Sequence, residues 1–137
     1  MAISGYSGTP LARKLGLKSP LKLLTIHAPR EYESWLGNLP EGVVLTTREG
    51  RTIEAVHVFA TERAFLDATL TKLRNELMQD GFVWVSWPKK ASKVQTDITE
   101  DIIREIALPL GFVDIKVCAV SEVWSGLKLV IRRSERK

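Results

Sequence analysis

The sequence predicts an α/β fold in which a single, mostly parallel sheet has helices on both faces. Apolar runs of strand length alternate with amphipathic, helix-like segments along most of the chain, a pattern typical of parallel sheets. Residues 82–87 form an apolar run between a glycine and a proline, as expected for a central strand covered on both faces. The last two strands, 113–120 and 127–132, are joined by a short turn and should form an antiparallel hairpin.

Six strands are expected, and the turn residues between them set their limits. Pro29 closes the first strand, and the polar segment 47–51 precedes the third. Strands joined by helical crossovers run parallel, so the sheet should be mostly parallel. The strand order that we expect is second, first, third, fourth, sixth, fifth (2-1-3-4-6-5), with an antiparallel sixth strand. The predicted strands are residues 21–28, 43–46, 53–60, 82–87, 113–120 and 127–132.

Two short helices are predicted in the first third of the chain. Thr9 is a good N-cap, Pro10 suits the first helical position, and Gly16 suits the residue after the last turn. The second short helix, 30–36, carries aromatic and apolar residues and precedes a glycine. Both helices should pack onto the sheet.

The longest helix is predicted at 62–79. Thr61 is expected to cap it, and Asp80-Gly81 is expected to end it. Its apolar residues recur at helical spacing, which favours one face packed on a sheet. They are Phe65, Leu66, Leu70, Leu73 and Leu77.

A last helix should begin close to Asp97. Asp97 can act as its N-cap, with Glu100 three residues on, as in a capping box. The stripe of Ile98, Ile102, Ile103 and Ile106 would be buried. Pro109 and Gly111 should end the helix.

Composition indicates one cytoplasmic domain spanning residues 1–137, in which residues 1–8 could be a flexible arm. The 137 residues are 45% hydrophobic and 26% charged, as in ordinary globular domains. A single cysteine, Cys118, excludes an internal disulfide and suits a reducing compartment. No apolar run approaches the roughly 20 residues of a membrane span, so we expect no membrane partner. The net charge of +4 leaves an anionic ligand or nucleic acid open as partners.

The sequence contains no complete catalytic or metal-binding motif. There is no Cys/His cluster at zinc spacing, no HExxH, no GxSxG and no Walker loop. His27 and His57 lie on predicted strands and are expected to be hydrogen-bonded structural residues. Cys118 is expected to be a small buried hydrophobic residue. Whether the chain is an enzyme stays open, its cofactor is unknown, and a role without catalysis is favoured.

A candidate anion site follows from the predicted topology. Ligands of open α/β sheets bind beyond the carboxyl ends of the strands, where helix N-termini favour anions. Three such ends should lie together, and the lysines after the fourth strand would add positive charge. The candidate residues are Arg30, Thr61, Ser86, Trp87, Lys89, Lys90 and Lys93. The alternative is that these lysines only solvate a loop.

Several short motifs stand out along the chain. They are residues 4–12, the block Val85-Ser86-Trp87-Pro88-Lys89-Lys90, Thr96-Asp97, Asp114, residues 116–119 and residues 124–127. Together they resemble a small bacterial family catalogued as the domain-of-unknown-function 3052 family. The resemblance covers nearly the whole chain. It implies no activity, because that family has none assigned.

The second half also resembles the Rossmann-like methyltransferase fold. It has a long helix, Asp80-Gly81, an apolar strand, a further helix and a terminal hairpin. The resemblance implies S-adenosylmethionine binding, but the first half departs from the pattern. Residues 27–30 are not glycine-rich, and Thr46-Thr47 stand where an acidic residue would hold the ribose.

Three functions are therefore open. The favoured one is a non-catalytic module that binds a small anionic ligand, a nucleotide or a protein partner. The alternatives are a minimal S-adenosylmethionine-dependent methyltransferase and a nucleic-acid-binding protein that uses its basic tail and exposed aromatic residues. The oligomeric state is not predicted.

Overall fold

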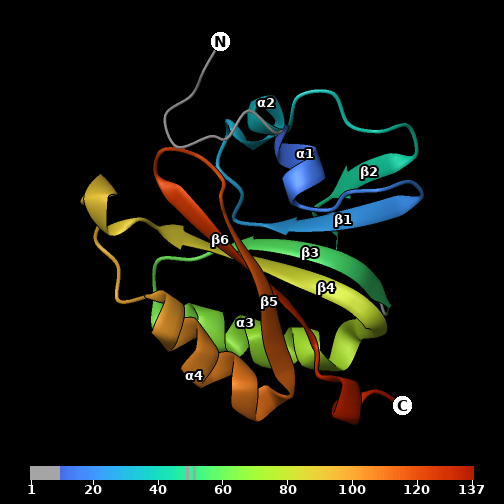
Figure 1. Cartoon of the computed structure of the whole chain (residues 1–137), viewed down its shortest axis with the longest axis vertical. Helices are drawn as coiled ribbons and strands as arrows, with labels where there is room; N and C mark the ends of the chain where they lie inside the picture. The colour runs from blue at the N-terminus through green and yellow to red at the C-terminus, as the bar shows by residue number, and fades with distance from the viewer. Residues whose placement is uncertain (1–9, 49, 51) are drawn as a thin grey trace.

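All six predicted strands form one sheet (Figure 1). The computed structural model describes residues 10–48, 50 and 52–137. The strands are β1 (Leu21–Ile26), β2 (Val43–Thr46), β3 (Ile53–Phe59), β4 (Leu77–Pro88), β5 (Phe112–Ala119) and β6 (Trp124–Ile131). The helices are α1 (Leu11–Lys14), α2 (Tyr32–Leu36), α3 (Arg63–Glu76) and α4 (Glu100–Leu110), with 3₁₀ turns η1 (Lys90–Ser92) and η2 (Arg133–Glu135). None of the described helices combines the length and apolar character needed to cross a membrane.

The predicted strand order is confirmed as β2-β1-β3-β4-β6-β5. Strands β2, β1, β3 and β4 pair in parallel, whereas β6 is antiparallel to both β4 and β5. The closing hairpin is thus confirmed as well. Because β1, β3 and β4 point the same way, their carboxyl ends lie at one edge of the sheet.

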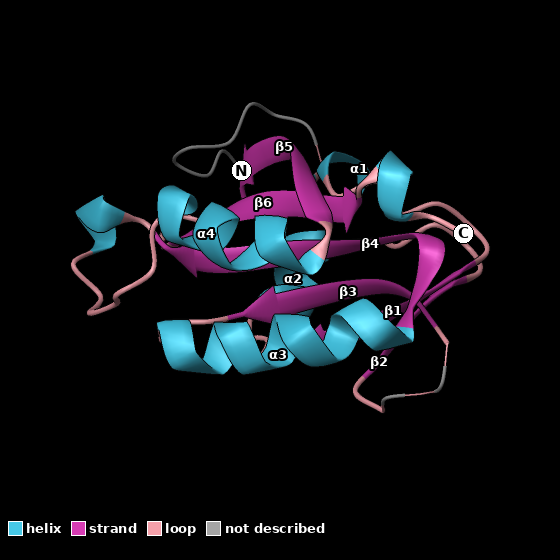
Figure 2. Cartoon of the chain, turned by 90° about the horizontal axis from the view of Figure 1, so that it is seen from below, coloured by secondary structure: helices cyan, strands magenta, loops and turns pink. Residues whose placement is uncertain are grey.

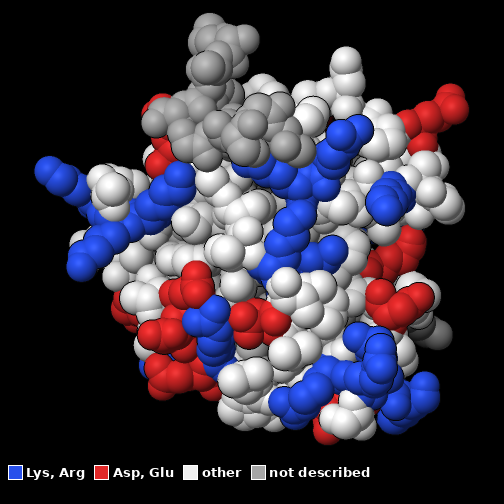
Figure 3. Space-filling view, viewed as in Figure 1, with Lys and Arg blue, Asp and Glu red and all other residues white. Residues whose placement is uncertain are grey.

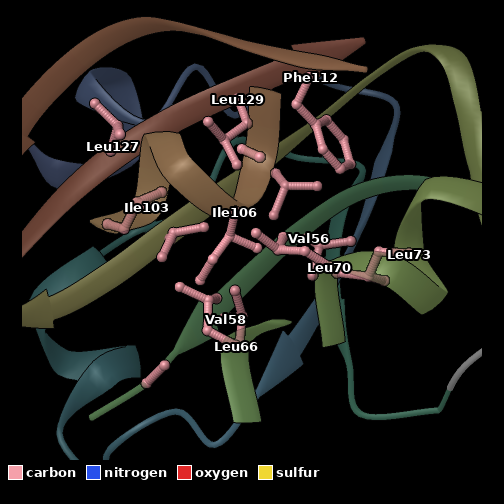
Figure 4. Packing of buried hydrophobic residues seen from close by; sticks show 14 of the residues in the cluster. Val56, Val58, Leu66, Leu70, Leu73, Ile103, Ile106, Phe112, Leu127 and Leu129 are labelled. Atoms are coloured by element: carbon pink, nitrogen blue, oxygen red, sulfur yellow. The ribbon is translucent and has the colours of Figure 1, made fainter. Parts of the chain in front are cut away.

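Helices cover both faces of the sheet, which makes the three predicted layers (Figures 1 and 2). Side chains of α3 and α4 share one apolar cluster with the sheet, and side chains of α1 and α2 share a second cluster on the opposite face. Figure 4 shows the first cluster, where Leu66 and Leu70 of α3 lie against Val56 and Val58 of β3. All four are fully buried, and burying each such side chain stabilises the fold by about 1.5–3 kcal/mol.

The connection from β2 to β3 consists of residues 47–52 and shows no helix in its described part. Parallel strands usually need a longer crossover that contains a helix. The face of β1 and β2 on the side of α3 therefore lacks a covering helix. Val44 of β2 is 55% exposed on this side.

The predicted boundary between α3 and β4 is wrong. Helix α3 ends at Glu76, and Leu77 already pairs with Ile53 of β3. Asp80-Gly81 does not end the helix but lies inside β4, where a Cβ on Gly81 would come within 2.6 Å of the Glu54 carbonyl oxygen. Gly81 is thus required by the close approach of two strands.

The predicted caps of α3 and α4 are also wrong. Glu62, not Thr61, is the N-cap of α3, and the Asp97 carboxylate accepts a hydrogen bond from the Arg63 backbone N–H at 2.7 Å. Asp97 therefore satisfies a free amide of α3 rather than one of its own helix. Helix α4 is capped by Thr99, whose hydroxyl accepts from the Ile102 N–H at 3.1 Å.

The glycine predictions at helix ends are confirmed. Gly16 follows α1 with φ of 75°, and Gly111 follows α4 with φ of 100°. Both are left-handed conformations that favour glycine. The expected Thr9 cap and the expected arm of residues 1–8 lie outside the described residues.

Candidate functional site

The carboxyl ends of β1, β3 and β4 meet at one edge, as the sequence predicts. The Ala60 N–H, just past β3, donates to the Ser86 carbonyl of β4 at 2.9 Å. The two corners that follow β3 and β4 are therefore neighbours. This edge is where open α/β sheets bind their ligands.

His27 lies at the centre of this edge. Strand β1 ends at Ile26, and His27 has φ of 58°, so the chain turns away from the sheet there. Its imidazole is stacked on the Phe65 ring of α3, with centroids 4.5 Å apart and planes 7° from parallel. His27 remains exposed to solvent.

Three hollows meet at His27, with volumes of about 600, 530 and 260 Å³. We name them the β1 hollow, the α2 hollow and the Trp124 hollow. The β1 hollow lies over the uncovered face of β1 and is bounded by Phe65 and Lys72 of α3. His27 is among the residues that line each of the three hollows, so together they form one irregular surface around it.

The α2 hollow is the most polar of the three. It lies between the ends of β1 and β2 and the start of α2. Arg30 and Glu33 bring one charge of each sign, and Thr46 and Thr47 bring hydroxyl groups. Hydroxyl and guanidinium donors suit the oxygen atoms of a sugar or a phosphate.

The Trp124 hollow has aromatic walls. Phe59 meets Trp124 edge to face, with centroids 5.1 Å apart, and Phe65 closes the opposite side. Thr61 and Glu62 supply its polar rim. Trp124 thus lines a hollow at the carboxyl edge of the sheet.

The charge around Thr61 is acidic rather than basic. A further hollow of about 440 Å³ is lined by Thr61, Glu62 and Asp97. The Thr61 carbonyl accepts hydrogen bonds from the Thr96 hydroxyl at 2.6 Å and from the Asp97 N–H at 3.3 Å. This packing holds the Asp97 carboxylate against the N-terminus of α3.

The predicted anion-site residues are divided between these hollows, the core and the surface. Arg30 lines the α2 hollow, and Thr61 lines the Trp124 hollow. Ser86 is fully buried, and Trp87 is 9% exposed and packs in the α3/α4 cluster.

The three lysines lie away from the hollows. Lys90 and Lys93 are exposed on and after η1, and Lys89 is half-buried, its N–H donating to the Val123 carbonyl at 2.7 Å. In Figure 3, basic side chains project from the left edge, where η1 lies in Figure 1. None of the three lines the β1, α2 or Trp124 hollow.

A buried polar chain connects β4, β3 and α2 beneath this edge. His57 Nε2 lies 2.7 Å from the Ser86 hydroxyl, and His57 Nδ1 lies 2.6 Å from the Tyr32 hydroxyl. Burial lowers the pKa of His57 to about 3. Burial, with Cys118 nearby, raises the pKa of Tyr32. These three hydrogen-bonded side chains are therefore uncharged at ordinary pH. The prediction that His57 is a hydrogen-bonded structural residue is confirmed.

Cys118 is half-buried beside the α1/α2 cluster rather than fully buried. Burial raises the pKa of its thiol, although Lys14 and Lys116 act in the opposite direction. The described residues contain no group of His, Cys, Asp and Glu that could hold a metal ion.

Sequence reasoning missed His27 and Phe65 as residues that line the edge. His27 was expected to be a structural strand residue, and Phe65 only a member of a helical stripe. The position of His27 next to Pro29, where β1 must stop, was the available signal. Its left-handed φ has no counterpart in the sequence pattern.

No family model matches the chain. No curated protein matches it in sequence either. The resemblance to the domain-of-unknown-function 3052 family therefore stays a prediction.

Solved structures do match it. A protein of Sulfolobus solfataricus assigned to the type 11 methyltransferases has a TM-score of 0.65 at 12% identity, over 93% of this chain and 92% of that chain. A Burkholderia thailandensis 1,6-didemethyltoxoflavin-N1-methyltransferase, which contains bound S-adenosylhomocysteine, has a TM-score of 0.56 at 12% identity, over 89% and 75%. The [4+2]-cyclase SpnF has a TM-score of 0.54 at 10% identity, over 89% and 78%.

Identities this low carry the fold alone, and a cyclase among the neighbours shows that the fold serves more than one chemistry. The strand order with antiparallel β6 agrees with these structures. The chain has the Rossmann-like fold of S-adenosylmethionine-dependent methyltransferases.

Proposed function

We propose that this protein is a non-catalytic binding module for a nucleotide-class ligand, held at the carboxyl edge of the sheet around His27. The observation that carries this proposal is the meeting of three hollows at one exposed, left-handed histidine. One hollow has aromatic walls and another has hydroxyl and guanidinium groups. A nucleotide has the same two parts, a planar base and an oxygen-rich sugar phosphate.

The aromatic side chains would receive the base. The imidazole of His27 is already parallel to the Phe65 ring, so a base can extend this stack on the exposed side of His27. Alternatively it can enter the Trp124 hollow between Phe65 and Trp124. Stacking of a base on an aromatic side chain contributes about 1–3 kcal/mol.

Arg30 and the threonines would receive the phosphate and the sugar. Arg30 is exposed in the α2 hollow beside Thr46 and Thr47. A guanidinium can bind phosphate with two parallel hydrogen bonds. The hydroxyl groups of Thr46 and Thr47 can bind the ribose in place of the acidic residue found in the usual pattern.

The burial of Ser86 and His57 supports the proposed non-catalytic role. Among the described residues, Ser86 and His57 are a hydroxyl and an imidazole in hydrogen-bond contact, 2.7 Å apart. Both are 0% exposed, so a substrate atom cannot approach them in this arrangement. Burial also holds the pKa of His57 near 3, far below that of a useful general base at neutral pH.

A methyltransferase is the second candidate, favoured by the fold of the neighbours. S-adenosylmethionine also contains a nucleoside and could occupy the same edge. The end of β2, however, offers Thr46, Thr47 and Arg48 rather than the carboxylate that holds the ribose in the usual pattern. The sulfonium of this cofactor is also cationic, whereas the guanidinium of Arg30 in the α2 hollow suits a phosphate.

Calorimetric titration with AMP and with S-adenosylmethionine separates the two candidates. The proposal expects AMP to bind with a Kd below about 1 mM, and Arg30→Gln to weaken it roughly tenfold. Lys90→Gln, the same charge change on η1, is the control at physiological salt, where it should leave AMP binding unchanged. Tighter binding of S-adenosylmethionine than of AMP would favour the enzyme, and binding of neither ligand would overturn the proposal.

The lysines of the predicted anion site have a test of their own. We propose that Lys89, Lys90 and Lys93 add to the attraction of an anion without touching it. Changing Lys89 and Lys90 together to Gln should then reduce the AMP affinity only at low salt. If the AMP affinity of this double variant does not change at low salt, the lysines only solvate the loop.

Family membership, a cytoplasmic location and a protein partner remain proposals that follow from the sequence. The motif resemblance supports the first, and the single cysteine supports the second. A protein partner would occupy the same edge in place of the nucleotide. Release of that partner when AMP is added would then detect competition between the two.

A further inference from the structure

A second, separate surface gathers lysines from four parts of the chain. They are Lys14 of α1, Lys18 in the loop after it, Lys116 of β5 and Lys128 of β6, and we name them the α1–β5 lysine group. Figure 3 shows basic side chains as a band across the middle of this face, where α1 and the hairpin of β5 and β6 lie in Figure 1. The band lies on the α1/α2 side of the sheet and shares no residue with the His27 hollows.

Hydrogen bonds and ring contacts hold Lys14, Lys116 and Lys128 in place. Lys116 Nζ donates to the Lys14 carbonyl at 3.1 Å, and Lys14 Nζ donates to the Ala119 carbonyl at 3.5 Å. Lys128 Nζ lies 4.4 Å from the centre of the Phe82 ring and would lie 3.3 Å from a Cβ placed on Gly16. These backbone and aromatic contacts hold the three side chains more firmly than solvent alone would hold a lysine side chain.

Three of the four lysines lack an acidic partner within the described part of the chain. No described Asp or Glu forms an ion pair with Lys18, Lys116 or Lys128. Burial lowers the pKa of Lys128, and the nearby charges of Lys116 and Lys18 lower it further. Like charges held this close repel each other, so an anion placed among them would be bound favourably.

The surface is a band rather than a pocket, which favours an extended anion over a small one. Basic side chains also gather at the lower right of Figure 3, where η2 and the C-terminus lie in Figure 1. That segment contains Arg132, Arg133, Arg136 and Lys137. Acidic side chains collect at the lower left, over α4. A polyanion on this face would therefore run from α1 toward the C-terminus and away from α4.

We propose that the α1–β5 lysine group binds the phosphodiester backbone of a nucleic acid without reading its sequence. Regularly repeated phosphates supply an extended row of single charges, and lysine binds each of them as a point charge. No described aromatic side chain of the band is free to stack on a base, because Phe82 is covered by Lys128 and Trp84 is fully buried. Recognition would thus be of the backbone alone.

The test is fluorescence anisotropy with a labelled DNA duplex over a series of salt concentrations. The wild-type chain should bind, and its affinity should fall linearly with salt on a log–log scale. Lys18→Gln with Lys116→Gln should weaken binding and reduce the slope by about 2, one for each lost phosphate contact. Lys90→Gln with Lys93→Gln removes the same charge from η1 and is the matched control, with circular dichroism to check that both variants fold.

Four results would overturn the proposal. The first three are no binding at low salt, an equal loss in both double variants, and equally tight binding of a poly-glutamate peptide of matched charge. The last would assign the band to an acidic protein partner. A scrambled duplex should bind as well as the first one, and a strong sequence preference would also contradict the proposal.

Discussion

The Nδ1 atom of His57 and the hydroxyl oxygen of Tyr32 lie 2.6 Å apart in the interior, joining the central sheet to α2. His57 reaches Ser86 of β4 through its other nitrogen, so one imidazole connects three elements. Burial keeps the ring neutral, and the two hydroxyl groups can match the one donor and one acceptor that a neutral ring offers. The pair therefore links the stability of the fold to pH.

Stability should fall as the pH falls below 6.5. Burial lowers the pKa of His57 from 6.5 to about 3, so between these values the unfolded chain binds a proton that the folded chain does not. This contribution is complete above pH 6.5 and is lost toward pH 3, at up to about 1.4 kcal/mol per pH unit. Urea unfolding at a series of pH values measures the slope.

His57→Gln should flatten this slope, whereas Tyr32→Phe should keep it. Both variants lose about 1–3 kcal/mol at pH 8, because each leaves a buried polar group without its partner. Only the first removes the titrating group. Equal slopes in wild type and His57→Gln would show that other residues set the acid sensitivity.

Gly81→Ala should destabilise the chain by about 2 kcal/mol. The new Cβ would stand 2.6 Å from the Glu54 carbonyl oxygen, and that backbone atom belongs to the neighbouring strand and cannot move freely. Gly50→Ala is the control, since no atom lies within 4 Å of its Cβ position, and it should change the free energy of unfolding by less than about 0.5 kcal/mol. Comparable losses in the two variants would contradict the pairing of β3 with the first half of β4.

Asp97→Ala should cost about 1 kcal/mol, because the Arg63 N–H at the start of α3 loses its acceptor. Asp80→Ala removes the same charge from an exposed position in β4 and should have little effect. Thermal unfolding compares the two. If Asp97 capped its own helix instead, hydrogen exchange would increase at the start of α4 and not at residues 63–65.

Strand order could be predicted from sequence because the strands are short apolar runs whose connections leave few arrangements. The end of α3 could not, because Leu77 continues the helical stripe of Leu70 and Leu73 and is also a buried strand residue. Gly81 was interpreted as a helix stop, since a close approach to Glu54 of another strand leaves no local trace. The N-cap of α4 is Thr99 rather than Asp97 for the same reason. Asp97 accepts its hydrogen bond from Arg63 of α3, a residue that it contacts only in the folded protein.

The edge where the three strands end could be predicted, but only some of the residues that line its hollows could be. Parallel strands place the ends of β1, β3 and β4 together, so Arg30 and Thr61 were correctly located at the edge. Ser86 lies in a part of β4 that is buried on both faces, and its hydrogen-bond partner His57 is 29 positions away in the sequence. The stack of His27 on Phe65 depends on a left-handed residue that no periodicity reveals.

An NMR titration of the ¹⁵N-labelled chain with AMP tests the central claim most directly, because it reports where a ligand binds as well as whether it does. The account predicts that amide shifts change first at residues 26–30, 46–48 and 60–65, around His27, with little change in η1 or at the amino ends of β1 and β3. Shift changes confined to other surfaces, or none at millimolar AMP, would contradict a ligand site at the carboxyl edge of the sheet.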